Sequence, residues 1–289
     1  MDDLSGYVKK YRDFFFNNIG IDINGKATPC KYYDGNEACT RSNGCYCKKL
    51  AEVRGSIDFY IPNEYRNLSI NNLTGCITVH GVSKEVWSKR NKKQIQATLR
   101  EYLFDGASQE DTADREGCNK HSVLDKRYSN CENIIIHGES IREEKNGMPT
   151  RPLPSGKTLI ACLILKEAIW RKIYNKSQSD AYGFVSYQNL RHELKTKSET
   201  VQHYKDADWL LIDDVSLPLN ENNFEHQEII DAFDDLLMTR MSNRLPTILV
   251  CEFDALKIDY TTQMGYSFQK IISLRNTWFV RVGDHSDNE

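Results

Sequence analysis

The chain has 289 residues, 39% hydrophobic and 27% charged, which is ordinary for a globular protein with one large or two modest domains. Its 38 basic and 41 acidic residues give a net charge of −3, so any DNA contact must come from a local basic patch or an oligomer. No apolar run is long enough to predict a membrane span. The acidic start, Met1–Lys10, also differs from a secretory signal. We therefore expect a cytoplasmic protein with no membrane partner.

The first region, residues 1–60, is predicted to be a small helical and Cys-rich domain that binds a partner. Its aromatic residues recur at helical spacing: Tyr7, Tyr11, Phe14 and Phe15. Its cysteines crowd into one polar segment: Cys30, Cys39, Cys45 and Cys47. Four thiolates on a short loop favour a structural Zn²⁺ site in a reducing compartment. The spacing is not a standard Cys-x-x-Cys pair, so an iron–sulfur cluster and free thiols are alternatives.

A basic stretch follows a short apolar run, Ile77–Val82, and predicts a helix over Lys84–Leu103. Its basic residues are interleaved with Trp87: Lys84, Lys89, Arg90, Lys92, Lys93 and Arg100. A second basic group occurs further along the chain: Arg191, His192, Lys195 and Lys197. Either group suits nucleic-acid phosphates, or is simply a solvated helix face. The polar residues between, 105–130, predict a loop.

From residue 131 onward, short apolar runs alternate with helical patterns. The predicted strands are Asn133–His137, Tyr182–Ser186, Trp209–Ile212, Thr247–Cys251 and Thr277–Val282. The predicted helices are Leu159–Tyr174, Tyr187–Lys197 and His226–Ser242. Short, continuously apolar strands that alternate with helices indicate an α/β fold, with a parallel sheet covered by helices on both faces.

A phosphate-loop motif opens the first of these helices. Pro154, Ser155, Gly156, Lys157 and Thr158 form the second half of a Walker A loop, whose backbone N–H groups and helix N-terminus hold phosphate oxygens. Lys157 is expected to reach the β/γ-phosphates of ATP, and the Thr158 hydroxyl to bind Mg²⁺. The alternative is a chance Gly-Lys-Thr at the start of a helix.

The first half of this loop departs from the consensus. The position of the first consensus glycine holds Arg151, and the glycine that follows the strand is Gly138. We therefore predict that Glu139–Leu153 contains an insertion and that Gly138 begins the nucleotide-binding loop.

An apolar strand that ends in two carboxylates, Asp213 and Asp214, matches a Walker B motif. Asp213 is expected to hold Mg²⁺ through water, and Asp214 to polarise the attacking water. Both follow a parallel strand, so they should lie beside the phosphate loop. The next predicted strand, Thr247–Cys251, is followed by Glu252, at a position where a sensor residue is often Asn, Ser or Thr.

Arg275 precedes the last strand and is predicted to reach the γ-phosphate of a neighbouring subunit, as an arginine finger does. Three other arginines compete for this role: Arg240, Arg244 and Arg281. For each of them, a surface arginine is the alternative.

These motifs together resemble the DnaC/DnaI group of helicase loaders, including phage versions, and the related IstB transposition ATPases. The resemblance covers residues 28–283. It rests on the following segments in order: Cys45-x-Cys47, Ile61–Leu73 with its Ile-Pro-x-x-Tyr-Arg, Gly156-Lys157-Thr158, Phe184–Tyr187 with Leu190 and Leu194, Ala207–Asp214, and Leu245–Leu249.

The resemblance implies an AAA+ P-loop ATPase domain over residues 61–289, with an N-terminal domain that grips a DnaB-type hexameric helicase. ATP would assemble a spiral homo-oligomer on single-stranded DNA, and hydrolysis would release the helicase. The chain ends soon after Val282 without the terminal arginine that often closes such sites, so we expect slow turnover. An IstB-like transposition ATPase is one alternative, although such proteins usually lack a Cys domain. A non-hydrolysing adaptor that contains zinc is another.

Overall fold

The computed structural model describes these parts of the chain: 20–21, 27–28, 55–66, 73, 76–79, 82–85, 87–104, 127, 130–138, 142–145, 148–152, 155–171, 181–217, 224–257 and 264–283. The cysteines predicted to bind zinc lie outside these ranges, as does Pro154. Residues 1–25 are predicted to be helical from the spacing of their aromatic residues, but residues 20–21 form a short strand, β1 (Gly20–Ile21), paired antiparallel with β2 (Ala27–Thr28). The division at residues 60 and 61 stays a prediction.

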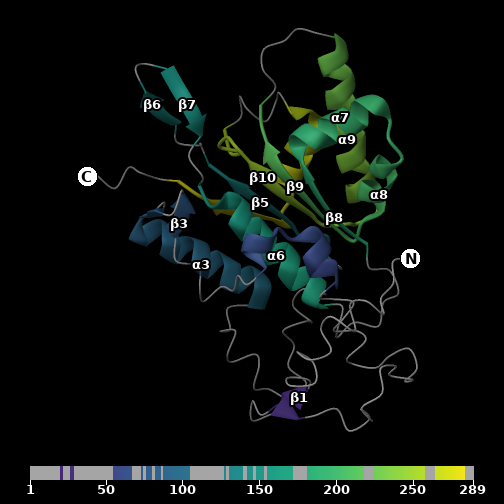
Figure 1. Cartoon of the computed structure of the whole chain (residues 1–289). Coiled ribbons are helices and arrows are strands. Elements are labelled where there is room, and N and C mark those ends of the chain that lie inside the picture. Colours follow the sequence, from purple (N-terminus) through teal and green to yellow (C-terminus); the bar gives the residue numbers. More distant parts are fainter. Residues whose placement is uncertain are drawn as a thin grey trace.

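A five-stranded parallel sheet forms the centre of the molecule (Figure 1). Its strands are β5 (Asn133–His137), β8 (Tyr182–Ser186), β9 (Trp209–Val215), β10 (Thr247–Cys251) and β11 (Thr277–Arg281). Their spatial order is β11-β5-β10-β9-β8, and every neighbouring pair is parallel. The predicted α/β fold with a parallel sheet is therefore confirmed, and it has the architecture expected of an AAA+ P-loop domain.

Helices cover both faces of this sheet, and successive residues of a strand enter different cores. The helices are α3 (Lys89–Phe104), α6 (Lys157–Arg171), α7 (Tyr187–Thr196), α8 (Thr200–Asp206), α9 (Phe224–Ser242) and α11 (Tyr266–Ser273). Ile134 and Ile136 pack with α3 and α6, whereas Ile135 packs with α7, α9 and α11. This alternation follows from the two-residue period of a strand. Figure 1 shows α3 and α6 on one side and α7, α8 and α9 on the other. None of the helices described is long and apolar enough to cross a membrane.

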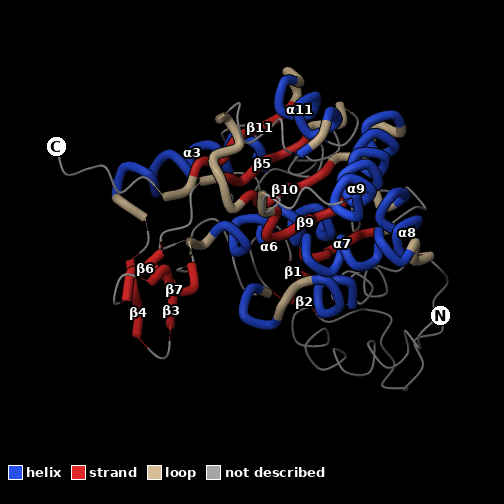
Figure 2. Tube along the Cα trace, turned by 90° about the horizontal axis from the view of Figure 1, so that it is seen from above, coloured by secondary structure: helices blue, strands red, loops and turns tan. Residues whose placement is uncertain are grey.

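The insertion predicted within Glu139–Leu153 contains a β-hairpin. Strand β6 (Arg142–Lys145) pairs antiparallel with β7 (Met148–Pro152). In Figures 1 and 2 the hairpin projects from the end of β5, away from the five-stranded sheet. The polar sequence of this segment gave no strand pattern, and the hairpin was not predicted.

The predicted basic helix is wrong in its first part. Lys84 belongs to β4 (Val82–Glu85), which pairs with β3 (Cys76–Val79), and α3 begins only at Lys89. The Ser88 hydroxyl accepts a hydrogen bond from Asn91 N at 3.1 Å, as residues that precede a helix commonly do. Trp87 therefore lies before the helix and is 3% exposed. It does not form part of an exposed DNA-binding face.

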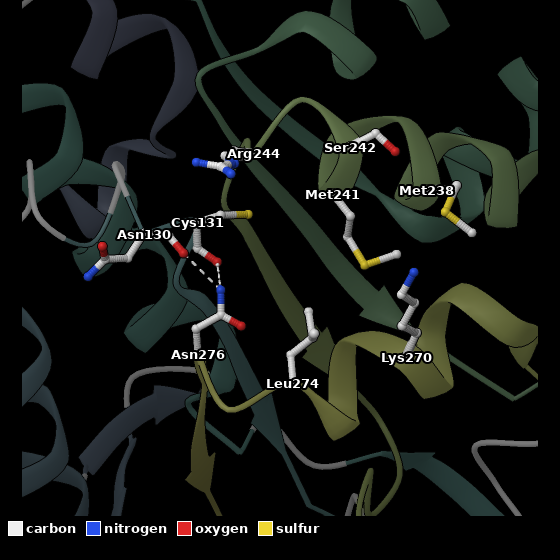
Figure 3. A pocket seen from close by; sticks show the side chains of 9 residues that line it. All are labelled: Asn130, Cys131, Met238, Met241, Ser242, Arg244, Lys270, Leu274 and Asn276. Atoms are coloured by element: carbon white, nitrogen blue, oxygen red, sulfur yellow. Dashed lines mark hydrogen bonds between the residues drawn. The ribbon is translucent and has the colours of Figure 1, made fainter.

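The amino-terminal ends of the parallel strands form one edge of the sheet, and their carboxyl-terminal ends form the opposite edge. A cavity of about 480 Å³ lies at the amino-terminal edge, between the segments that precede β5 and β11 and the ends of α9 and α11 (Figure 3). Within it, Asn276 Nδ2 donates to the carbonyl oxygens of Asn130 and Cys131 at 2.8 and 2.7 Å. The predicted phosphate loop follows β5, so it lies at the opposite, carboxyl-terminal edge, where ligands bind in open parallel sheets.

Candidate phosphate-binding site

The start of α6 has the backbone of a tight phosphate loop. Gly156 has a φ of +82°, in the region that L side chains rarely adopt. A Cβ atom there would also lie 2.9 Å from Cζ2 of Trp87. Glycine is therefore required at this position by both the backbone conformation and the close approach of the indole. The N–H groups in the first turn of an α-helix have no acceptor within the helix, so the start of α6 is a suitable place for a phosphate.

Gly138, predicted to begin the nucleotide loop, has a packing role in the structure. Its φ is +143°, and a Cβ atom would lie 1.9 Å from the carbonyl oxygen of Val282. The Gly138 amide donates to Phe253 O at 3.2 Å. Glycine is thus needed here because the chain that leaves β5 runs against the segment after β11. Contact with a nucleotide stays a prediction.

Lys157 is held inside the protein at the same edge. Its Nζ donates to Gly138 O at 2.8 Å and to Cys251 O at 2.9 Å, and it pairs with Glu252 Oε1 at 3.0 Å. The Lys157 side chain is 1% exposed and that of Glu252 is 26% exposed. The ammonium group therefore lies between the ends of β5 and β10, with a carboxylate on its more open side.

The predicted magnesium ligands meet across the sheet. Thr158 Oγ1 donates to Asp213 Oδ1 at 3.1 Å, which joins the first turn of α6 to the end of β9. Burial and the neighbouring Asp214 carboxylate raise the pKa of Asp213 to about 7, against the lowering effect of the Thr158 hydrogen bond. Glu252 adds a smaller raising effect. The site thus concentrates negative charge beside the phosphate loop, as a cation site does.

Asp214 has an unusual backbone conformation at the end of β9. It is exposed, unlike the other residues of β9, and its φ is +56°. The pairing of β9 with β10 shifts register here, between Leu249 and Cys251. Such bulges redirect side chains near active sites. The irregularity turns Asp214 out of the sheet while Asp213 stays buried next to Thr158.

The chemistry of these residues fits a magnesium nucleotide. Mg²⁺ prefers oxygen ligands and is commonly held by one or two carboxylates together with substrate phosphates, and Thr158 and Asp213 offer such oxygens side by side. Among the described residues, no cluster of three or more His, Cys, Asp or Glu side chains forms a metal site by itself. Thr158 and Asp213 would hold the metal together with the phosphates of a nucleotide.

Two features of this site were not predicted from the sequence. Trp87 Nε1 donates to Ser155 O at 2.8 Å, so the indole braces the loop from a position 68 residues earlier. The other is η1 (Asn63–Tyr65), whose Tyr65 lies near the acidic pair. Burial is the main cause of the raised pKa of Tyr65, and the charges of Asp213 and Asp214 add to it. The Ile-Pro-x-x-Tyr-Arg segment was a signal that this part of the chain mattered.

The arginines predicted as fingers occupy different places. Arg275 is exposed and precedes β11, so it lies at the edge opposite the phosphate loop of its own chain. Its role as a finger stays a prediction. Arg244 is also exposed. Arg240 is 1% exposed and donates to the carbonyl oxygens of Tyr204, Ala207 and Pro246. Arg240 is a structural residue and is no longer a candidate.

Comparisons with known proteins give a likeness of fold. No protein-family model matches the chain, and no curated protein matches it. Among solved structures, DnaI is 18% identical, with a TM-score of 0.36 over 63% of this chain and 90% of that chain. The DnaC helicase loader is 15% identical, with a TM-score of 0.37 over 68% of this chain and 99% of that chain. These are the proteins that the sequence motifs resemble, but at such identities and TM-scores the likeness supplies no residue roles.

Proposed function

We propose that this chain is an ATPase that loads a DnaB-type hexameric helicase onto single-stranded DNA. The observation that carries the ATPase part is the hydrogen bond from Thr158 Oγ1 to Asp213 Oδ1, at 3.1 Å. It joins the two motifs that a P-loop ATPase needs at one edge of a parallel sheet. The loader part rests on the sequence motifs that resemble the DnaC/DnaI group.

In the proposed mechanism, Mg·ATP supplies the scissile phosphoanhydride and the cation that balances its charge. The amides at the start of α6 bind phosphate oxygens, and Lys157 places its ammonium against them. Thr158 and Asp213 provide oxygen ligands for the cation. Asp214, turned out of the sheet by its left-handed backbone, orients the water for in-line attack. Arg275 of a neighbouring copy stabilises the negative charge on the phosphate that is being transferred.

ATP hydrolysis by the purified chain, with and without single-stranded DNA, tests the ATPase part. We expect slow turnover that DNA stimulates and that Lys157→Ala abolishes. Asp214→Asn should bind ATP but hydrolyse it at least ~100-fold more slowly, because positioning the nucleophile makes contributions of that order. An Asp214→Asn variant as fast as the parent would show that this carboxylate has another role.

A helicase-loading assay tests the other part. The chain is mixed with a DnaB-type hexamer and forked DNA coated with single-strand-binding protein, and unwinding is measured. We expect unwinding to require this chain and ATP. Retained turnover without helicase association or loading would favour the IstB-like alternative, in which the ATPase coats DNA.

Zinc and the DNA contact are further parts of the proposal. Metal analysis of the full chain should find about one Zn²⁺ per chain, which Cys45→Ser should reduce.

For DNA, α3 carries Lys89, Arg90, Lys93 and Arg100 as exposed side chains. Replacing Lys93 and Arg100 with Gln should weaken single-stranded DNA binding and reduce its salt dependence. The same replacement of exposed Lys195 and Lys197, near the end of α7, tests the second basic group and serves as the matched comparison.

One observation favours a second candidate function, the non-hydrolysing adaptor. Lys157 is engaged by Glu252 and by two carbonyl oxygens, which would disfavour nucleotide binding. ATP turnover that Lys157→Ala abolishes would exclude the adaptor.

A further inference from the structure

Glu252 forms an ion pair with the ammonium group of Lys157, which in the proposed function binds a nucleotide phosphate. Glu252 Oε1 lies 3.0 Å from Lys157 Nζ. The backbone amide of Glu252 donates to Val215 O at 2.9 Å, which fixes the start of its side chain between the ends of β9 and β10. The contact is therefore placed by the sheet itself and does not depend on a loop.

The three described partners of Lys157 differ in charge and in freedom to move. Gly138 O and Cys251 O are neutral backbone atoms at the ends of strands. Glu252 is charged, and its side chain is 26% exposed, so it can turn toward water. A phosphate that approaches Lys157 would replace Glu252 more easily than either carbonyl, because only the carboxylate can leave without moving the backbone.

Charge strengthens this competition. Glu252 is a third carboxylate at the edge that holds Asp213 and Asp214, since its amide donates to the carbonyl oxygen of Val215, one residue after Asp214. A polyphosphate that enters this edge therefore meets a carboxylate that both repels it and holds its binding partner. Neutral Asn, Ser or Thr at this position would hydrogen-bond without either effect.

We propose that Glu252 is a gate on the phosphate site, which holds Lys157 when no nucleotide is bound and must be displaced by the phosphates of a nucleoside di- or triphosphate. Glu252 thereby lowers the nucleotide affinity of the resting chain. The inference rests on the proposed nucleotide site. It gives Glu252 a positioning role, through Lys157, that a neutral sensor residue lacks.

Calorimetric titration of the full chain with ADP tests the gate by affinity and not by turnover. Glu252→Gln keeps the size and the hydrogen-bonding capacity of the side chain but removes its charge. We expect Glu252→Gln to bind ADP about tenfold more tightly than the wild type, as loss of a competing charge-assisted contact implies. Glu252→Ser, with the residue type more usual at this position, should shift affinity in the same direction. Asp235→Asn is the matched control, because it removes one carboxylate that pairs with Lys205, remote from the phosphate loop.

The outcomes separate the gate from the site. Wild-type binding with unchanged or weaker affinity in both Glu252 variants would overturn the gate and leave the nucleotide site in place. Failure of the wild type and of both variants to bind ADP or ATP would overturn the nucleotide site, and the gate with it. Binding by the Glu252 variants alone would support both, with a gate strong enough to close the resting site.

Discussion

Two buried cations lie at opposite edges of the sheet, and they are held in different ways. Arg240, at the amino-terminal edge, donates to Thr247 Oγ1 and to the carbonyl oxygens of Tyr204, Ala207 and Pro246. These partners are neutral. Lys157, at the carboxyl-terminal edge, has two carbonyl partners and also Glu252. Both residues are almost fully buried, at 1% and 2% exposure.

The difference teaches how a structural cation can be told from a functional one. The described partners of Arg240 are backbone carbonyl oxygens and one buried side chain, so a ligand could replace them only if that edge of the sheet unfolded. Lys157 has one charged and partly exposed partner, Glu252. A partner that can leave without moving the backbone marks the edge where we expect a ligand to bind.

The largest effect should come from removing the structural cation. Arg240→Met leaves buried carbonyl oxygens without their donor, and we expect the free energy of unfolding to fall by about 3 kcal/mol or more. Arg244→Met is the matched control, because Arg244 is exposed four residues further along, and it should change stability by less than about 0.5 kcal/mol. Chemical denaturation measures both. Similar losses in the two variants would mean that the Arg240 contacts contribute little.

The second largest loss of stability should come from removing the contact of Trp87 with the phosphate loop. Trp87→Phe removes the hydrogen bond to Ser155 O and the ring atoms against Gly156, and should cost about 2 kcal/mol. Trp278→Phe is its match, because Trp278 Nε1 donates to Glu132 Oε2 at 2.7 Å away from the loop. Both variants should lose stability, but only Trp87→Phe should weaken ADP binding. Equal ADP affinities in the two variants would show that the indole only fills the core.

Removing the Lys157 ammonium group should reduce the free energy of unfolding by less than either of these changes. Lys157→Met leaves two carbonyl oxygens without this donor, fewer than Arg240→Met does, and Glu252 is partly exposed. We therefore expect a loss of about 1–2 kcal/mol, below that of Arg240→Met, together with loss of nucleotide binding. The two variants are compared by denaturation under the same conditions. If Lys157→Met were as destabilising as Arg240→Met, the contrast between the two edges would be wrong.

The framework of the fold could be predicted because its signal is local. Strands such as Tyr182–Ser186 and Thr247–Cys251 have the predicted bounds, since buried parallel strands are continuously apolar. Helix α8 (Thr200–Asp206) was missed, because it is short and mostly polar and its pattern does not stand out from a loop.

The candidate site was predicted only where its residues form motifs. Lys157, Thr158, Asp213 and Asp214 belong to two short motifs, and the parallel sheet brings the motifs together. The contacts of Trp87 with Ser155 and of Glu252 with Lys157 join residues far apart in sequence, and no local pattern records them. Trp87 was assigned to the wrong surface for this reason, because a tryptophan among lysines looks exposed until its packing is known.

The smallest effect concerns pH, and it should also come from the carboxyl-terminal edge. His137 Nδ1 lies 3.1 Å from Asp254 Oδ1, and Nε2 is buried with no hydrogen-bond partner among the described residues. Burial lowers the pKa of His137, Arg281 and Lys157 lower it further, and Asp254 opposes the shift. In the unfolded chain a histidine titrates near ~6.5. Below that pH the unfolded state binds a proton that the folded state does not, so stability is lost as the pH falls.

His137→Gln removes this difference in proton binding. Denaturation at about pH 7.5 and about pH 5.5 should therefore show a smaller loss of stability on acidification for His137→Gln than for the wild type. His192→Gln, at an exposed position, should acidify like the wild type. Arg240→Met should as well, because the described partners of Arg240, a threonine hydroxyl and three carbonyl oxygens, do not titrate. An unchanged loss in His137→Gln would mean that this histidine gains its proton in the folded state as readily as in the unfolded one.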